Sequence, residues 1–217
     1  VPLLEIVTEP CMHSAEEAFA FLVELRRLVR WLDVCDGNME EGSMRCDANI
    51  SIRLKGEKEL GTRVEVKNLN SIRNVKRAID IEKDRLIALL ENNENIIQET
   101  RSFDADTNTT FALRSKEEAD DYRYFPEPDL PPFFISEKYI SDINDHMPVL
   151  PDQLKEKYIS TFQLSEYDAG ELVRDKETAD FFEGLIRHTK NFKSAANWLL
   201  GPLKSYCNEN DIVITDF

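Results

Sequence analysis

Two short runs of strictly alternating polar and apolar residues carry the side chains best suited to chemistry. Within 44–54 and 62–68 the polar positions share one side of a predicted two-stranded ribbon, namely Arg45, Asp47, Asn49, Ser51, Arg53, Arg63, Glu65 and Lys67. Carboxylates on adjacent strands can converge on one cation, and Mg²⁺ typically takes one or two of them. Arg holds phosphate through paired hydrogen bonds. The pattern indicates either a metal and phosphate site or the solvated outer face of an antiparallel sheet.

Other candidate residues flank this ribbon, and each has a plainer alternative. Residues 38–43 form either a turn or a backbone nest around Gly42 whose amides face an anion. Glu99 and Arg101 point to the same side of a predicted strand, either as part of the site or as a surface ion pair of little energetic value.

Several common chemistries are excluded by the motifs that the chain lacks. Neither GxxxxGK[ST] nor GxGxxG occurs, so a P-loop or Rossmann nucleotide site is not encoded, and metal, Arg and Lys would have to hold a nucleotide's phosphates. HExxH is absent, and the 3 histidines lie far apart. The 4 cysteines show no CxxC spacing, which favours reduced cytosolic thiols over a zinc or redox site.

The first 114 residues alternate between strand and helix patterns. A capping pattern at Ser14 and Glu17 opens one predicted helix, and Asn70 or Ser71 can cap another. Strands are predicted at 1–7, 44–54, 62–68, 96–103 and 109–114, and helices at 15–32 and 72–90. This order predicts an α+β fold in which helices pack on a largely antiparallel sheet.

The remainder of the chain changes character. A short helix is predicted at 115–120, followed by a stiff, proline-rich segment whose Tyr122 and Tyr124 either pack in the core or stack on a base or ribose. Only helical patterns follow, at 137–145, 152–161, 169–173, 177–190 and 192–207. We expect an all-α domain after a boundary within 136–150. Its apolar positions, including Phe182 and Trp198, predict the core of a helical bundle. Its lysines either contact a phosphate backbone or lie on a solvated helix surface, namely Lys190, Lys193 and Lys204.

The net charge and the hydropathy of the chain bear on whether it binds nucleic acid or a membrane. The formal net charge of -15 argues against a general nucleic-acid binder. Any contact with nucleic acid is therefore expected either to be local or to lie mostly on chain beyond this sequence. No run approaches the roughly 20 apolar residues that span a bilayer, so no membrane association is expected. The chain opens on Val1 and stops after an apolar pair, and we expect it to be an internal fragment.

Five sequence blocks, in order, resemble the GatB family, the B subunits of aspartyl/glutamyl-tRNA amidotransferases. They are PLLEIVTEP (2–10), DGNMEEGSMRCDAN (36–49), GTRVEVKNLNS (61–71), QETR (98–101) and DDYRYFPEPD (120–129). YDA (167–169) and ANWL (196–199) continue the similarity, which covers nearly the whole chain.

The resemblance implies a division into the C-terminal part of a catalytic cradle domain, 1–140, and the start of a helical domain, 141–217. It also implies a cytoplasmic ligase that works with GatA and GatC subunits. Such an enzyme uses ATP and Mg²⁺ to phosphorylate the side-chain carboxylate of Glu-tRNA(Gln) or Asp-tRNA(Asn). Ammonia released from glutamine in GatA then displaces the phosphate.

Roles follow for residues within the matching blocks. The resemblance implies Glu5, Glu65 and Asp47 as metal ligands, and Arg45, Lys67 and Arg101 as catalytic partners of phosphate or carboxylate. Glu40 and Asn49 would contact the nucleotide or support the site.

Two departures affect these expectations. Cys11 stands where the family commonly has Asp, and the family's amino-terminal metal-binding portion lies before Val1. We therefore expect no amidotransferase activity from this chain alone. The rival interpretation is a scaffold that binds tRNA or docks other subunits without chemistry of its own.

Overall fold

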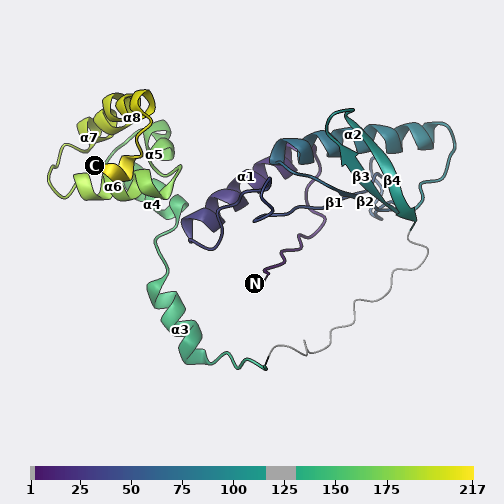
Figure 1. The fold of residues 1–217 in the computed structure, drawn as a ribbon, viewed down its shortest axis with the longest axis horizontal. Helices are drawn as coiled ribbons and strands as arrows, with labels where there is room; N and C mark the ends of the chain where they lie inside the picture. Colours follow the sequence, from purple (N-terminus) through teal and green to yellow (C-terminus); the bar gives the residue numbers. More distant parts are fainter. Residues whose placement is uncertain (1–2, 116–130) are drawn as a thin grey trace. The chain divides into compact units, whose positions relative to one another are not determined.

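The chain folds into two compact units, each with its own core. A computed structural model describes residues 3–115 and 131–217 (Figure 1). The first unit comprises Val1–Leu25 with Gly37–Leu130, and the second comprises Arg26–Asp36 with Pro131–Phe217. Helix α1 (Ala15–Trp31) contributes residues to both units.

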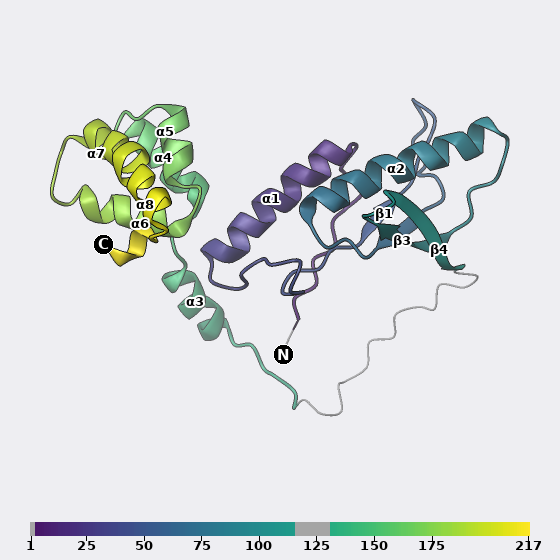
Figure 2. The ribbon, with the colours of Figure 1, turned by 45° about the horizontal axis from the view of Figure 1, so that its top comes forward.

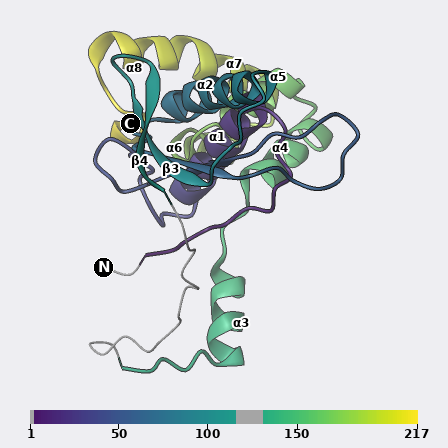
Figure 3. The same cartoon turned by 90° about the vertical axis from the view of Figure 1, so that its right-hand side faces the viewer.

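The first unit is built on a four-stranded mixed sheet. Its strands are β1 (Ala48–Ile50), β2 (Val64–Lys67), β3 (Glu99–Asp104) and β4 (Thr109–Ser115), in the order β1-β2-β3-β4. The pairs β1/β2 and β3/β4 are antiparallel, and β3 and β4 form a hairpin (Figure 3). The central pair β2/β3 is parallel because α2 (Ile72–Glu91) carries the chain back between them. The predicted α+β class is confirmed, and the parallel central pair was not anticipated.

One face of the sheet is covered by α2, which contacts β1 and β4 (Figure 1). Val64 and Val66 are completely buried there and belong to the same hydrophobic core as Val75 and Leu86 of α2. Since side chains alternate along a strand, Glu65 and Lys67 point to the opposite face. We call these the α2 face and the polar face.

Local hydrogen bonds set where the first two helices begin. Ser14 Oγ accepts from the amide of Glu17, whose carboxylate accepts in turn from the amide of His13. Ser71 Oγ accepts from the amide of Asn74 and caps α2. Both predicted caps are therefore confirmed.

The predicted ribbon pairs in the expected antiparallel sense, but its strands are much shorter than the alternating sequence suggested. Arg53 donates to the carbonyl of Lys58 at 2.7 Å, so a side chain closes the loop beyond β1. Gly61 passes so close to Ile52 that an added Cβ would lie 2.0 Å from the Ile52 carbonyl oxygen. This close approach replaces regular strand pairing.

The strand predicted at 1–7 is wrong for its described residues. Residues 3–7 have no regular structure, and Leu3 is 92% exposed. This short apolar, partly β-branched run has no neighbouring strand to pair with among the described residues. The helix predicted at 115–120 and Tyr122 and Tyr124 lie outside the described residues, apart from Ser115, which ends β4.

In its described part, the second unit is helical beyond residue 136. It contains α3 (Glu137–His146), α4 (Pro151–Ser160), α5 (Glu166–Leu172), α6 (Lys176–Leu185), α7 (Phe192–Trp198) and α8 (Lys204–Asn210) (Figure 2). A 3₁₀ turn, Ile214–Asp216, follows α8. Tyr158, Leu172 and Phe182 form the centre of the core, to which Trp31 also belongs. The indole of Trp31 donates to the carbonyl of Val149 at 3.0 Å.

Two predictions within this unit need correction. The helix predicted at 192–207 is interrupted by a π-helical turn, Leu199–Leu203, because Pro202 lacks the amide that a regular helix requires. Trp198, predicted as core, is 48% exposed. Among the described residues, no helix is both long and apolar enough to cross a membrane.

Candidate functional site

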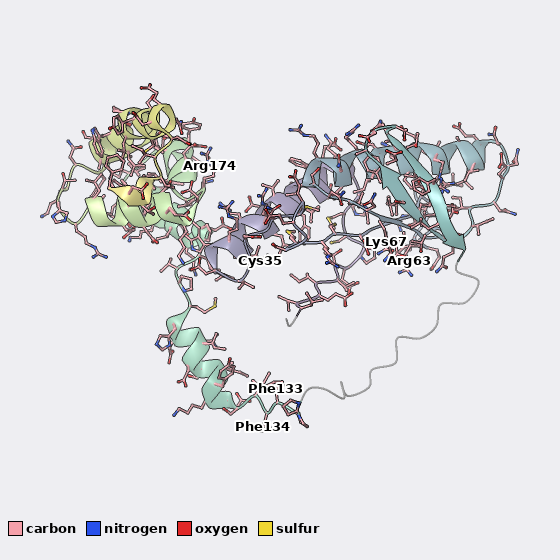
Figure 4. The ribbon with its side chains drawn as sticks, viewed as in Figure 1. Cys35, Arg63, Lys67, Phe133, Phe134 and Arg174 are labelled. Carbon is pink, nitrogen blue, oxygen red and sulfur yellow. The ribbon has the colours of Figure 1, made fainter. Side chains whose placement is uncertain are left out.

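The polar face of the sheet brings three of the predicted site residues together, two carboxylates around the ammonium group of Lys67. Lys67 Nζ lies 3.0 Å from Asp47 Oδ2 and 3.4 Å from Glu65 Oε1. Figure 4 labels Lys67, at the end of β2, close to Arg63, which immediately precedes that strand. We call Asp47, Glu65 and Lys67 the carboxylate–lysine cluster.

The cluster is partly shielded from solvent. The side chain of Glu65 is 16% exposed, whereas those of Lys67 and Asp47 are 39% and 46% exposed. The hydrogen bond to Asp47, reinforced by the nearby charges of Asp47 and Glu65, raises the pKa of Lys67 above its ordinary value. The two carboxylates therefore stabilise the charged form of Lys67.

A fourth residue reaches the cluster from β3. Thr100 is 2% exposed, and its Oγ1 donates to Glu65 Oε2 at 2.8 Å. The parallel register places Thr100 directly beside Glu65. The sequence block that contains Thr100 was recognised, but its contact with Glu65 was not predicted. The register of two strands joined by a helix cannot be derived from the alternation of residues within each strand.

Arg101 lies on the α2 face, away from the cluster. It is paired with Val66 in the β2/β3 register. Its guanidinium contacts Glu99 Oε1 at 2.8 Å, as the shared side of Glu99 and Arg101 predicted, and Thr110 Oγ1 at 2.9 Å. The structure thus does not bring Arg101 together with Lys67.

The loop before β1 is organised internally. The amides of Glu40 and Glu41 both donate to Asn38 Oδ1, at 3.0 and 3.3 Å, so these two donors are already satisfied. The Glu40 side chain is exposed. Gly42 has φ +80°, and a Cβ added there would lie 3.7 Å from the guanidinium of Arg45. The loop is a folded turn that holds Arg45 over Gly42.

The remaining nucleotide candidate, Asn49, is exposed and faces Glu65 across the β1/β2 pair. Asn49 therefore borders the cluster.

The three predicted metal ligands do not form one group. Among the described residues, no set of three or more His, Cys, Asp and Glu side chains could hold a metal ion. Glu5 is exposed in the irregular segment before α1. Asp47 and Glu65 do converge on one cationic group, which fits the one or two protein carboxylates that Mg²⁺ requires.

Fold and site together define a class: an α+β domain whose mixed sheet presents two carboxylates and a lysine on one face. The described residues provide carboxylates and a lysine, which can transfer protons or pair with phosphate. They contain no cluster of Cys and His side chains of the kind that binds zinc.

The chain belongs to the GatB/GatE catalytic domain family, whose model matches residues 1–141. Three curated relatives each carry the name of the GatB component of an aspartyl/glutamyl-tRNA(Asn/Gln) amidotransferase. That of Alkalilimnicola ehrlichii is 48% identical over 99% of this chain and 45% of its own length. That of Janthinobacterium sp. is 50% identical over 98% of this chain and 44% of its own. That of Caldicellulosiruptor bescii is 48% identical over 98% and 44%. The chain thus spans less than half the length of these relatives.

Proposed function

We propose that this chain is part of the catalytic GatB component of an ATP-dependent tRNA amidotransferase. GatB phosphorylates the side-chain carboxylate of Glu-tRNA(Gln) or Asp-tRNA(Asn), and ammonia from a GatA subunit then replaces the phosphate. The names of the relatives support this proposal. The structural observation that carries it is the position of Lys67 between Asp47 and Glu65.

The proposal includes the setting in which the reaction takes place. Residues 1–140 form the C-terminal part of a catalytic cradle domain, and 141–217 begin a helical domain. The working enzyme is a cytoplasmic complex with GatA and GatC subunits and a misacylated tRNA. It is a glutamine-dependent, carbon–nitrogen bond-forming ligase.

The reaction brings two anions together, a carboxylate nucleophile and a terminal phosphate. Such transfers depend on positioning and charge neutralisation rather than on a protein nucleophile. When bound, ATP would supply the phosphoryl group and Mg²⁺ would supply part of the neutralising charge. Asp47 and Glu65 would hold the metal, for which they offer converging oxygens.

Cationic and polar side chains complete the proposed site. Lys67 carries a positive charge between the two carboxylates and neutralises phosphate or substrate carboxylate. Arg45 assists from the loop before β1, and Glu40 and Asn49 contact the nucleotide or support its ligands. Arg101 is left out of this set, because it lies on the α2 face and contacts Glu82 and Glu99 there.

The test replaces cluster residues in the complete amidotransferase complex. Glu65→Gln and Lys67→Met should each lower the single-turnover rate of phosphoryl transfer by about a hundredfold or more, because each removes a charge that faces the reacting groups. The measurement is ADP formation that depends on misacylated tRNA.

Glu57→Gln is the matched control, because Glu57 is an exposed carboxylate in the loop after β1 and should leave the rate unchanged. A rate for Glu65→Gln within about twofold of the unmodified complex would overturn the proposal.

A tRNA-binding scaffold is the second candidate, and one observation in the second unit favours it. A shallow hollow of about 360 Å³ is lined by Thr161, Phe162, Gln163, Lys190, Asn191, Phe192 and Lys193. Neither Lys190 nor Lys193 forms an ion pair within the described chain, whereas Lys155 and Lys157 do. A scaffold without chemistry predicts that Glu65→Ala weakens tRNA affinity and leaves phosphoryl transfer intact. The catalytic proposal predicts the reverse.

A further inference from the structure

The two oxygens of Glu65 have different partners. Oε1 lies 3.4 Å from Lys67 Nζ, and Oε2 accepts from Thr100 Oγ1 at 2.8 Å. A carboxylate with one such contact can rotate about its terminal torsion, which is broad in Glu. With both contacts in place, the plane of the carboxylate is fixed and Oε1 faces the point where Asp47 Oδ2 also converges.

Thr100 is itself held by its neighbours on either side. Glu99 and Arg101 point to the α2 face, where Glu99 contacts Arg85 at 3.2 Å and Arg101 contacts Glu82 at 3.5 Å. Glu82 is completely buried and also accepts from Arg85 at 2.8 Å. Both residues flanking Thr100 are therefore tied to α2, which fixes the backbone from which the Thr100 hydroxyl projects.

A neighbouring hydroxyl provides a natural comparison. Ser102 is 6% exposed, lies on the polar face two residues after Thr100, and is paired with Lys67 in the β2/β3 register. Among the described residues it makes no side-chain hydrogen bond to Glu65 or Lys67. Burial of a hydroxyl on this face is thus not sufficient for contact with the cluster.

We propose that Thr100 is a positioning residue that orients Glu65 for its ligand through the Thr100 Oγ1–Glu65 Oε2 hydrogen bond. This inference rests on the proposed function, because it requires Glu65 to face the nucleotide and its metal. Thr100 does not touch the substrate and acts only through Glu65. A hydrogen bond to a charged group contributes more than one between neutral groups, so its loss has a measurable consequence.

The experiment measures the affinity of the complete complex for ATP in the presence of Mg²⁺, by calorimetry. Thr100→Val keeps the shape of the side chain and removes the donor, so the Kd should rise by about tenfold. Thr100→Ser retains the hydroxyl and should remain within about threefold of the unmodified complex. Ser102→Ala, the matched control, should have no effect on the Kd.

A double-mutant cycle identifies the route of the effect. In a Glu65→Ala background, Thr100→Val should change the Kd by less than about twofold, because its acceptor is gone. Thermal unfolding of every variant separates lost positioning from lost stability.

Each contrary result has a distinct meaning. Equal effects of Thr100→Val in both backgrounds, or equal losses in Thr100→Val and Thr100→Ser, would overturn the positioning role. If Glu65→Ala itself alters neither the Kd nor phosphoryl transfer, the proposed function fails, and the role of Thr100 fails with it. If Glu65→Ala is damaging and Thr100→Val is silent, only the role of Thr100 is lost.

Discussion

Cys46 shows how differently two adjacent residues behave when a chain alternates between faces. Its thiol packs against the hydrophobic core of the first unit, whereas the neighbouring Asp47 reaches the polar face. Burial, and secondarily the charge of Asp47, raises the pKa of Cys46 to about 11. The thiol therefore stays protonated and is a poor nucleophile at neutral pH.

Labelling with a maleimide at pH 8 tests this prediction. Cys46 should react about a hundredfold more slowly than an ordinary thiol, because its thiolate fraction is lower by that factor. Cys11, which is exposed in the same chain, is the internal control and should react rapidly. Mass spectrometry of peptides resolves the two sites, and comparable rates would contradict the assigned burial of Cys46.

The same shift links Cys46 to stability. The folded pKa of about 11 lies above the ordinary value of 9.0, so the folded state favours the protonated thiol. Its contribution to stability is present below pH 9.0 and is lost as the pH rises through about 11.

For single residues of the cluster, the alternation of polar and apolar positions was enough to predict which face of the sheet they occupy. Asp47, Glu65 and Lys67 were placed on one face from sequence, and they do meet there. The position of Thr100 beside Glu65 depends on the register of a parallel pair, which has no local signature. The same register places Arg101 on the opposite face.

At the scale of elements, the contact between α2 and the sheet depends on a buried charge. The carboxylate of Glu82 faces Arg85 and Arg101 and accepts from the hydroxyl of Thr110 at 2.8 Å. Removing one member of a buried ionic group leaves its partners uncompensated, which typically costs about 3–5 kcal/mol.

Glu82→Gln should therefore lower the free energy of unfolding by about 3 kcal/mol. Urea denaturation followed by far-UV circular dichroism measures the change. Glu94→Gln, an exposed carboxylate just after α2, should shift it by less than about 0.5 kcal/mol. Equal stabilities of the two variants would show that Glu82 does not hold α2 to the sheet.

Helices were predictable more closely than strands, for a physical reason. The helix predicted at 72–90 is observed as Ile72–Glu91, because both the apolar period and the Ser71 cap are local. The ribbon was overestimated because strand length depends on a partner, and Gly61 ends the pairing through contact with Ile52. The π-helical turn Leu199–Leu203 likewise arises where Pro202 interrupts an otherwise continuous helical pattern.

At the scale of the whole molecule, charge is unevenly distributed. The chain has a formal net charge of -15, yet residues 184–208 contain no Asp or Glu and include Arg187, Lys190, Lys193 and Lys204. Lys204 is paired with Glu171 at 3.1 Å. Lys190 and Lys193 both line the hollow described above. A local phosphate contact is compatible with an acidic chain in this arrangement.

Replacing Lys190 and Lys193 by Gln in the complete complex tests that contact. Affinity for tRNA should fall, and the slope of log Kd against log salt concentration should decrease by about 2, because each lysine that neutralises a phosphate contributes about 1. Filter binding across a salt series measures both quantities. Lys155→Gln, which removes a lysine already paired with Glu166, serves as control. An unchanged slope would show that the hollow of the second unit does not contact the tRNA phosphates.

The crossover through α2 also imposes an order of events during translation. Glu65 precedes the threonine that fixes it by 35 positions, and a complete helix lies between them. At synthesis rates of about 5–20 residues per second, the ribosome delivers that partner about 2–7 seconds later. A nascent chain that has just exposed its first hairpin thus carries Glu65 with its orientation still unset, and binding competence arises only after the second hairpin has emerged and docked.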